Sequence, residues 1–368
     1  MSKYIAILGR QPRISLAELE ALFDGVRQIS PTLAEFESIK TPDIRRLGGT
    51  LKIAEPINLE KFLEELPKEG KITIGVSDFT PKTTPYLAQG EALKMKRRLI
   101  KAGHSVRVIP NKTAVLSSAT SLHNHLFTAT KIELLKYKHN FYRVVQLSNL
   151  EDYTKRDQKR PARDAKVGML PPKLAQILIN LCGDLPKGAR VLDPFCGTGV
   201  LLQEATLMGY TPYGTDVSER MVEYTERNLE WLLRQEQNHV TPVISQGDAT
   251  SFQWTPPIAA VACETYLGPP MSTPPIDIKL RTAKQECKAI ILGFLKNLGP
   301  QISSGTPVVI AVPAWLRPNG QYERLLNIDE LQNLCYNVSS FKNLGQDDLL
   351  YHRDGQVVAR EIIVLRKK

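Results

Sequence analysis

The sequence is poor in cysteine and has no long apolar run. Five cysteines are spread over 368 residues without a Cys-x-x-Cys pair, so we expect neither a disulfide framework nor a metal site, and a reducing, cytoplasmic environment fits. No apolar stretch approaches the roughly 18–20 residues of a membrane helix, and the N-terminal apolar run is too short for a signal peptide. Hydrophobic residues still make up 42% of the chain and charged residues 23%, which excludes global disorder.

Positive charge is concentrated in the first part of the chain. Residues 1–165 contain 28 basic and 18 acidic residues, whereas residues 166–368 contain 20 of each. The whole net charge of +10 therefore comes from the first part. A basic region joined to a neutral, enzyme-like region indicates a polyanionic partner that one part holds and the other modifies.

Short strand and helix patterns alternate irregularly over residues 1–150. Apolar runs at 4–8 and 71–76 predict strands. We expect a small α/β element at 1–70, an α+β domain at 71–150, and a polar, basic linker at 151–167 that is too polar to build a core.

From residue 168 onward, strand and helix patterns alternate regularly, which predicts βαβ units and a parallel, doubly wound sheet. Near the end, the runs 349–352 and 357–365 flank Asp354-Gly355, a hairpin signal. We therefore expect a Rossmann-like α/β domain at 168–368, with a seven-stranded sheet that closes in an antiparallel hairpin. That layout is typical of methyltransferases that use S-adenosylmethionine.

A glycine loop follows the first strand of this domain. Asp193-Pro194-Phe195-Cys196-Gly197-Thr198-Gly199 ends a strand, turns, and opens a helix. The loop is neither Gly-x-Gly-x-x-Gly nor a P-loop. A carboxylate at the position of Asp193 would repel a diphosphate, but it would bind the ammonium of an aminoacyl tail such as that of methionine.

Two further acids stand at the ends of the next two strands. Asp216 lies 19 residues after Gly197, a position suited to hydrogen bonds to ribose hydroxyls. Asp248 follows the third strand, where a carboxylate can accept from an adenine amino group. Each acid alone also suits a helix cap, but together with Asp193 they indicate S-adenosylmethionine.

The glycine loop, followed by Glu204-Ala205, resembles the first motif of the THUMP-domain tRNA guanosine-N2 methyltransferases, UPF0020-like enzymes that act at position 10 of tRNA. Upstream, the run from Arg156-Asp157 through Arg160-Pro161-Ala162-Arg163-Asp164 to Gly168-Met169-Leu170-Pro171-Pro172 is similar to the segment that packs beside the cofactor in that family. The match is dense over 150–270, looser over 70–150, and faint before residue 70.

The resemblance implies a THUMP-like module that holds tRNA, followed by the catalytic domain, and it leaves open a small activator subunit. It implies that Pro171, Phe195, Thr198 and Gly199 also contact the cofactor, with residues 168–173 beside its methionine end. For residues 169–172 the alternative is a helix start with prolines in the first turn.

The loop after the fourth strand departs from the family pattern. Enzymes that methylate an exocyclic amine carry Asp/Asn-Pro-Pro-Tyr/Phe there: oxygens hold the N–H bonds, and the aromatic ring stacks on an extruded base. This chain has Glu264-Thr265-Tyr266-Leu267-Gly268-Pro269-Pro270. We expect Glu264 to accept from guanine N1 and N2 and Tyr266 to stack, with a loop cap as the alternative for Glu264.

Two basic clusters are candidates for phosphate contact. One lies on the helix expected at 90–102 and contains Lys94, Arg97, Arg98 and Lys101; the other lies in the linker and contains Lys155, Arg156, Lys159, Arg160 and Arg163. A solvated face is the alternative for the helix. For the linker, RNA contact and packing against the catalytic domain are both open.

We therefore expect a cytoplasmic RNA methyltransferase that transfers a methyl group from S-adenosylmethionine to N2 of a tRNA guanosine. One alternative is a DNA amino-methyltransferase, although no loop is long enough to be an obvious target-recognition insert. The other is an inactive RNA-binding protein that retains the cofactor fold, for which the Glu-Thr-Tyr loop is the best support. The degree of methylation, the tRNAs used and the oligomeric state stay open.

Overall fold

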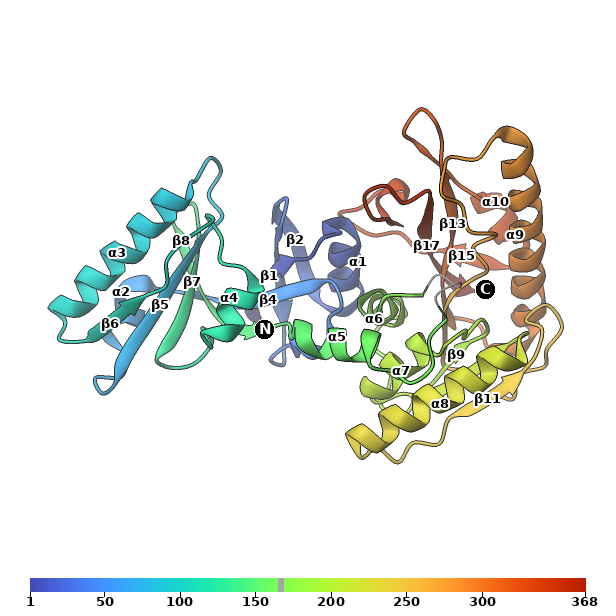
Figure 1. The fold of residues 1–368 in the computed structure, drawn as a ribbon, viewed down its shortest axis with the longest axis horizontal. Helices are drawn as coiled ribbons and strands as arrows, with labels where there is room; N and C mark the ends of the chain where they lie inside the picture. The colour runs from blue at the N-terminus through green and yellow to red at the C-terminus, as the bar shows by residue number, and fades with distance from the viewer. Residues whose placement is uncertain (165–168) are drawn as a thin grey trace. The chain divides into compact units, whose positions relative to one another are not determined.

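The computed structural model describes residues 1–164 and 169–368 and divides the chain into two compact units (Figure 1). The first unit consists of residues 1–12, 23–45 and 50–151, and the second of residues 13–22, 46–49 and 152–368. Two short N-terminal segments thus belong to the second unit, although the expected domain boundaries assign them to the element at 1–70.

An eight-stranded sheet forms the first unit, in the order β2-β3-β1-β4-β8-β7-β5-β6. Strand β5 is parallel to β6 and β7, and the other pairs are antiparallel. Because β4 pairs with β8, one sheet continues across residue 70, which corrects the expected division between 1–70 and 71–150. The strands are β1 (Ser2–Leu8), β2 (Asp24–Ser30), β3 (Leu33–Ser38), β4 (Thr50–Ile57), β5 (Lys71–Asp78), β6 (Ser105–Val108), β7 (Lys131–Tyr137) and β8 (Asn140–Leu147).

The helices of this unit are α2 (Leu59–Glu64), α3 (Pro85–Lys101) and α4 (Ser118–His123). Helix α3 begins before the expected start at residue 90, because the Thr84 side chain accepts from the backbone N–H of Leu87 and Pro85 stands in the first turn. Its buried side chains, among them Met95 and Leu99, pack on β5 and β7. The opposite face carries the basic residues.

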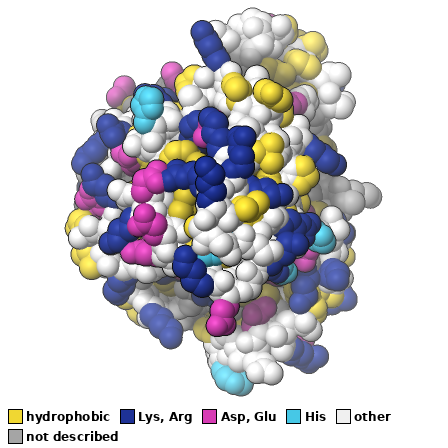
Figure 2. Space-filling model, turned by 90° about the vertical axis from the view of Figure 1, so that its left-hand side faces the viewer, with side chains coloured by type: hydrophobic (Ala, Val, Ile, Leu, Met, Phe, Trp, Pro, Cys, Tyr) yellow, Lys and Arg dark blue, Asp and Glu magenta, His cyan; other side chains and the backbone are white. Residues whose placement is uncertain are grey.

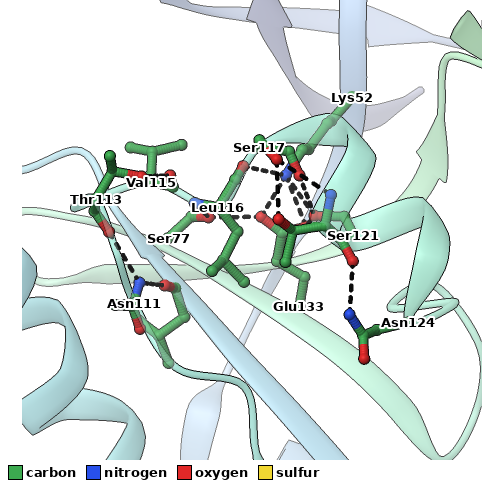
Figure 3. A network of polar contacts seen from close by, with 12 residues as sticks. Lys52, Ser77, Asn111, Thr113, Val115, Leu116, Ser117, Ser121, Asn124 and Glu133 are labelled. Atoms are coloured by element: carbon green, nitrogen blue, oxygen red, sulfur yellow. Dashed lines mark hydrogen bonds and ion pairs between the residues drawn. The ribbon is translucent and has the colours of Figure 1, made fainter.

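A buried polar network, which was not predicted from the sequence, connects four elements of the first unit (Figure 3). Lys52 Nζ of β4 lies 2.6 Å from a carboxylate oxygen of Glu133 on β7, and both side chains are almost wholly buried. Lys52 also donates to Ser121 of α4 and to the carbonyl of Leu116. Ser77 of β5 donates to Glu133 and accepts from the Leu116 amide. The network attaches α4 and the preceding loop to the sheet.

The second unit contains a nine-stranded sheet whose main path is β11-β10-β9-β12-β13-β17-β15. Strands β9 to β13 are parallel, and β17 is antiparallel to both β13 and β15. The predicted doubly wound sheet is therefore confirmed. The strands are β9 (Arg190–Asp193), β10 (Thr211–Asp216), β11 (Val243–Gln246), β12 (Ala260–Glu264), β13 (Pro307–Leu316), β14 (Tyr322–Glu323), β15 (Tyr336–Val338), β16 (Leu350–Tyr351) and β17 (Val358–Lys367).

The antiparallel end of the sheet differs in detail from the expected hairpin. Strand β16 pairs with β17 over two residues but lies off the main path, where β15 takes the edge position. Strand β15 was not predicted because three residues are too few to show a period-2 pattern. The short strand β14, which pairs with β13, was missed for the same reason.

Helices cover both faces of this sheet. In β12, Ala260 and Ala262 face a core shared with α6 and α7, whereas Val261 and Cys263 face a core shared with α9. This alternation shows that β12 is buried on both sides, as the layered α/β architecture requires. The helices are α1 (Pro12–Leu22), α5 (Leu150–Gln158), α6 (Pro172–Asn180), α7 (Val200–Leu207), α8 (Glu219–Glu236), α9 (Asp277–Leu298) and α10 (Ile328–Asn333).

Helix α1 and residues 46–49 pack within the second unit through a buried carboxylate. Glu18 accepts from the backbone N–H groups of Gly48 and Gly49, at 2.8 Å each, and from Asn180 Nδ2 at 2.7 Å. Burial raises the pKa of Glu18 to about 7. An early segment of the chain is therefore part of the structure that supports α6.

Candidate active site

The glycine loop between β9 and α7 has the geometry expected of a ligand cradle. Gly197 and Gly199 have φ of +53° and +79°, which favours glycine. A Cβ at Gly199 would come within 3.0 Å of Thr225, whereas one at Gly197 would meet nothing closer than the Phe195 carbonyl at 3.9 Å. Thr225 of α8 donates to the Gly197 carbonyl at 2.8 Å. The loop is therefore held from one side and open at Gly197.

Asp193, at the end of β9, is a buried carboxylate whose negative charge is not neutralised by an ion pair within the described residues. It is 3% exposed and accepts from the Phe195 amide at 3.1 Å. Among residues 1–164 and 169–368, none forms an ion pair with it. Burial raises its pKa well above 3.8, and the nearby Asp216 and Glu264 raise it further. A buried anion of this kind is stabilised by a cationic ligand.

Asp216, at the end of β10, links its strand to the glycine loop. One carboxylate oxygen accepts from Gly197 N and the other from Ser218 N, each at 2.9 Å. Burial raises its pKa, and the two amides oppose that shift. Each oxygen keeps a further lone pair. Beside it, Val217 is 68% exposed, an apolar surface that the sequence analysis did not single out.

Asp248, after β11, is exposed and turned toward its own loop. It accepts from both the amide and the hydroxyl of Thr250, at 2.8 and 2.7 Å, and these bonds lower its pKa. Gly247 N donates to the Asp216 carbonyl at 2.9 Å, which joins the second and third strand ends. A Cβ at Gly247 would lie 2.1 Å from Phe252, so glycine is required there.

The loop after β12 begins with a buried ion pair. Arg360 of β17 donates from Nε to one oxygen of Glu264 at 2.8 Å and from Nη2 to the other at 3.3 Å. The side chain of Arg360 is 7% exposed and that of Glu264 is 11% exposed. Burial raises the pKa of Glu264 and Arg360 opposes that shift. Glu264 was expected here from the sequence, whereas Arg360 was not, because 96 residues separate the two.

The next two residues orient the loop. Thr265 is buried, and both its amide and its hydroxyl donate to the Ala311 carbonyl, at 3.0 and 3.1 Å. Tyr266 is half-buried, and its hydroxyl donates to Glu286 at 3.3 Å. Stacking of Tyr266 on a base stays a prediction.

The other residues predicted to contact the cofactor are Phe195 and Thr198 in the glycine loop and Pro171 before α6. The Phe195 ring packs edge-on against Phe294 with centroids 5.2 Å apart. The Thr198 carbonyl accepts from Asn228 Nδ2 at 2.8 Å. Pro171 precedes the first turn of α6, with ψ of 137°, which fits the helix-start interpretation. Gly168, also expected near the cofactor, lies outside the described residues.

The linker cluster divides into buried and exposed residues. Residues 150–158 form helix α5, and Arg156 Nε pairs with the buried Glu204 of α7 at 2.7 Å. The side chain of Arg160 is fully buried. Arg156 and Arg160 therefore pack within the second unit, which is the alternative that the sequence left open for the linker. Lys155, Lys159 and Arg163 are exposed, and their RNA contact stays a prediction.

The basic residues of α3 lie on the exposed side of that helix. Figure 2 shows Lys and Arg side chains gathered on the face of the first unit, with apolar side chains between them. Lys94 pairs with Glu91 at 2.8 Å, and Arg98 pairs with Glu60. Arg97 and Lys101 are also exposed.

Neither a metal centre nor a membrane span occurs in the described residues. No group of three or more His, Cys, Asp or Glu residues within 1–164 and 169–368 has the geometry to hold a metal ion. No helix in the same residues has the length and apolar character needed to cross a membrane.

Comparison with known proteins identifies the central part of the second unit. Residues 159–262 match the family UPF0020, described as an RMKL-like methyltransferase domain. The tRNA (guanine(10)-N2)-dimethyltransferase of Methanothermobacter thermautotrophicus is 32% identical over 149 residues, which is 40% of each protein. The enzyme of the same name from Pyrococcus abyssi is 41% identical over 85 residues, 23% of each. The matched region thus spans two fifths or less of these relatives.

One solved structure, TrmN of Thermus thermophilus, aligns over the full length of both chains, with 18% identity and a TM-score of 0.49.

Proposed function

We propose that this protein, whose residues 159–262 match a methyltransferase domain, methylates N2 of a guanosine in tRNA with S-adenosylmethionine as the methyl donor. The observation that carries the proposal is Asp193, a buried carboxylate without an ion pair in the described residues, beside a glycine loop that is open at Gly197. A ligand with an ammonium group supplies the charge that this site needs.

The strand ends provide one group for each part of the cofactor. Asp193 would accept from the ammonium, and the free lone pairs of Asp216 would accept from ribose hydroxyls. Asp248 would accept from the adenine amino group, while exposed Val217 offers the base an apolar contact. When bound, the cofactor supplies an electrophilic methyl group.

The loop after β12 would hold the base. Arg360 occupies one lone pair on each oxygen of Glu264, so each oxygen keeps another for guanine N1–H and N2–H. Adenine presents an acceptor at N1, which a carboxylate repels. Tyr266 would stack on the base. As the new N–C bond forms, the bond between the methyl group and the sulfonium of the donor breaks and its electron pair stays on sulfur, which leaves a thioether. Glu264 would accept the proton that the amine loses and pass it to water.

The proposal that the substrate is tRNA rests on the relatives and on the charge of the chain. The curated relatives are tRNA guanine-N2 dimethyltransferases that act at position 10. The net charge of +10 lies in the part before residue 166, and positive charge provides sequence-independent affinity for nucleic acid. Four further points stay predictions: that the first unit is THUMP-like, that it binds tRNA, that the protein is cytoplasmic, and that it has an activator subunit.

The test uses the purified full chain in two steps. Calorimetry first measures uptake of S-adenosylmethionine and its demethylated product; no uptake refutes the proposal. Transfer is then measured on tRNA transcripts with guanosine or adenosine at position 10, and on duplex DNA, with mass spectrometry of the nucleosides. We expect N2-methylated guanosine only with guanosine at position 10. Methyladenine in DNA supports the first alternative, and cofactor and tRNA binding without transfer supports the second.

A further inference from the structure

The pairing of β17 with β13 brings Arg360 to the strand edge that carries the site. In this register Pro313 is opposite Arg360, and Ala311, the parallel partner of Glu264, is opposite Ile362. Arg360 is therefore two residues along β17 from Ile362, which is level with Glu264. Because side chains alternate between the two faces of a sheet, Arg360 and Glu264 share a face. Its guanidinium contacts both oxygens of Glu264, and its side chain is 7% exposed.

Charge is distributed unequally among the acids at this edge. Asp193, Asp216 and Glu264 are close enough that the last two raise the pKa of the first. Within the described residues, Glu264 has a cationic partner and Asp193 has none. The buried edge therefore has a counter-charge at Glu264 and, within the described residues, none at Asp193, where a cofactor ammonium would bind.

We propose that Arg360 is a positioning residue for the base: it fixes the plane of the Glu264 carboxylate and keeps that carboxylate an acceptor for guanine N1–H and N2–H. This inference rests on the proposed function and adds to it the reason why a glutamate can stand in this loop.

The physical reason lies in the two states of Glu264. Without a counter-charge, burial beside Asp193 favours the protonated acid, whose O–H is a donor facing the two guanine donors. With Arg360 paired, the carboxylate stays ionised while the pair as a whole is neutral, so it does not add to the negative charge at Asp193. Arg360 on β17 opposes the rise in the pKa of Glu264 that burial causes. Glu264 in turn raises the pKa of Asp193 on β9 and of Cys263 on β12.

The test compares Arg360→Met, Arg360→Lys, Glu264→Gln and the double variant Glu264→Gln/Arg360→Met in the full chain. We expect Arg360→Met to lower kcat at pH 7 by about tenfold or more, the scale on which contacting residues couple. The acidic limb of its pH profile should move to higher pH, and its affinity for S-adenosylmethionine should change by less than about twofold. Arg360→Lys should restore part of the activity.

In the Glu264→Gln background, Arg360→Met should change kcat by less than about threefold, because a neutral amide needs no counter-charge. Arg324→Met is the matched control, since Arg324 pairs with Glu361, the next residue of β17. It should leave the pH profile unchanged. If Arg360→Met fails to fold, the pH profile of Arg360→Lys decides.

Equal losses from Arg360→Met in both backgrounds, or an unmoved pH profile, would overturn the inference while leaving the proposed function intact. A wild-type chain that binds no cofactor, or transfers no methyl group, overturns both.

Discussion

Replacing Asp193 with asparagine should move stability and cofactor affinity in opposite directions. The substitution keeps the shape of a buried side chain and its bond from the Phe195 amide. It removes a charge that has no ion pair in the described part of the chain. We therefore expect the cofactor-free variant to be at least as stable as the wild type at neutral pH.

Cofactor binding should weaken strongly in the same variant. A hydrogen bond to a charged group contributes about 1.5–3 kcal/mol, and about 1.4 kcal/mol is a factor of ten in affinity. Losing the charge at Asp193 should therefore raise the dissociation constant of S-adenosylmethionine by about 10- to 150-fold.

The pKa of Asp193 adds a pH signature. Because the folded pKa lies above 3.8, the wild type loses stability as pH rises from that value through the folded pKa. Asparagine at this position abolishes that component. Below the raised pKa, cofactor binding to the wild type should release a proton, which calorimetry in buffers of different ionisation enthalpy detects.

Calorimetry and thermal unfolding at about pH 7.5 provide the two measurements, with the exposed Asp184→Asn as the matched control. An unchanged dissociation constant for Asp193→Asn would refute the reasoning. So would a loss of stability with affinity intact, which would make Asp193 a structural residue.

Three further perturbations follow from the geometry. Lys52→Met should destabilise the first unit by about 3–5 kcal/mol, because it leaves buried Glu133 unpaired; in urea unfolding, adding Glu133→Leu should recover most of the stability. Glu18→Gln should remove a decline in stability between about pH 4.5 and 7, because burial raises the Glu18 pKa to about 7; unfolding at about pH 5 and pH 8 checks this. Charge reversal at Arg97 and Lys101 should weaken tRNA binding and reduce its salt slope by about one for each phosphate that is no longer neutralised, measured by filter binding at several salt concentrations; an unchanged slope would place α3 outside the RNA interface.

The local features of the candidate site could be predicted from the sequence. The glycine loop and the acids after three strands are defined by short spacings, and the backbone geometry of Gly197 and Gly199 agrees with them. The parallel sheet could be predicted as well, because strand and helix periodicities alternate visibly from residue 168 onward. These signals depend on neighbours in the chain, which a sequence displays directly.

The partners of buried charges could not be predicted. Arg160 is as basic as its exposed neighbours in sequence, yet its side chain is fully buried. Lys52 and Glu133 are separated by 81 residues and meet only because β4, β8 and β7 are adjacent. The sequence shows which residues are charged, but it does not show which residues of opposite charge they contact.

The sequence by itself determined the α/β fold class of the second unit, its parallel strands β9 to β13, and the acids at the ends of four of them. Only the tertiary structure decided that Arg360 pairs with Glu264 and that one sheet of the first unit continues across residue 70. It also decided that α1 belongs to the second unit. The reason is physical: periodicity and turn chemistry act over a few residues, whereas strand register brings together side chains that are dozens of residues apart.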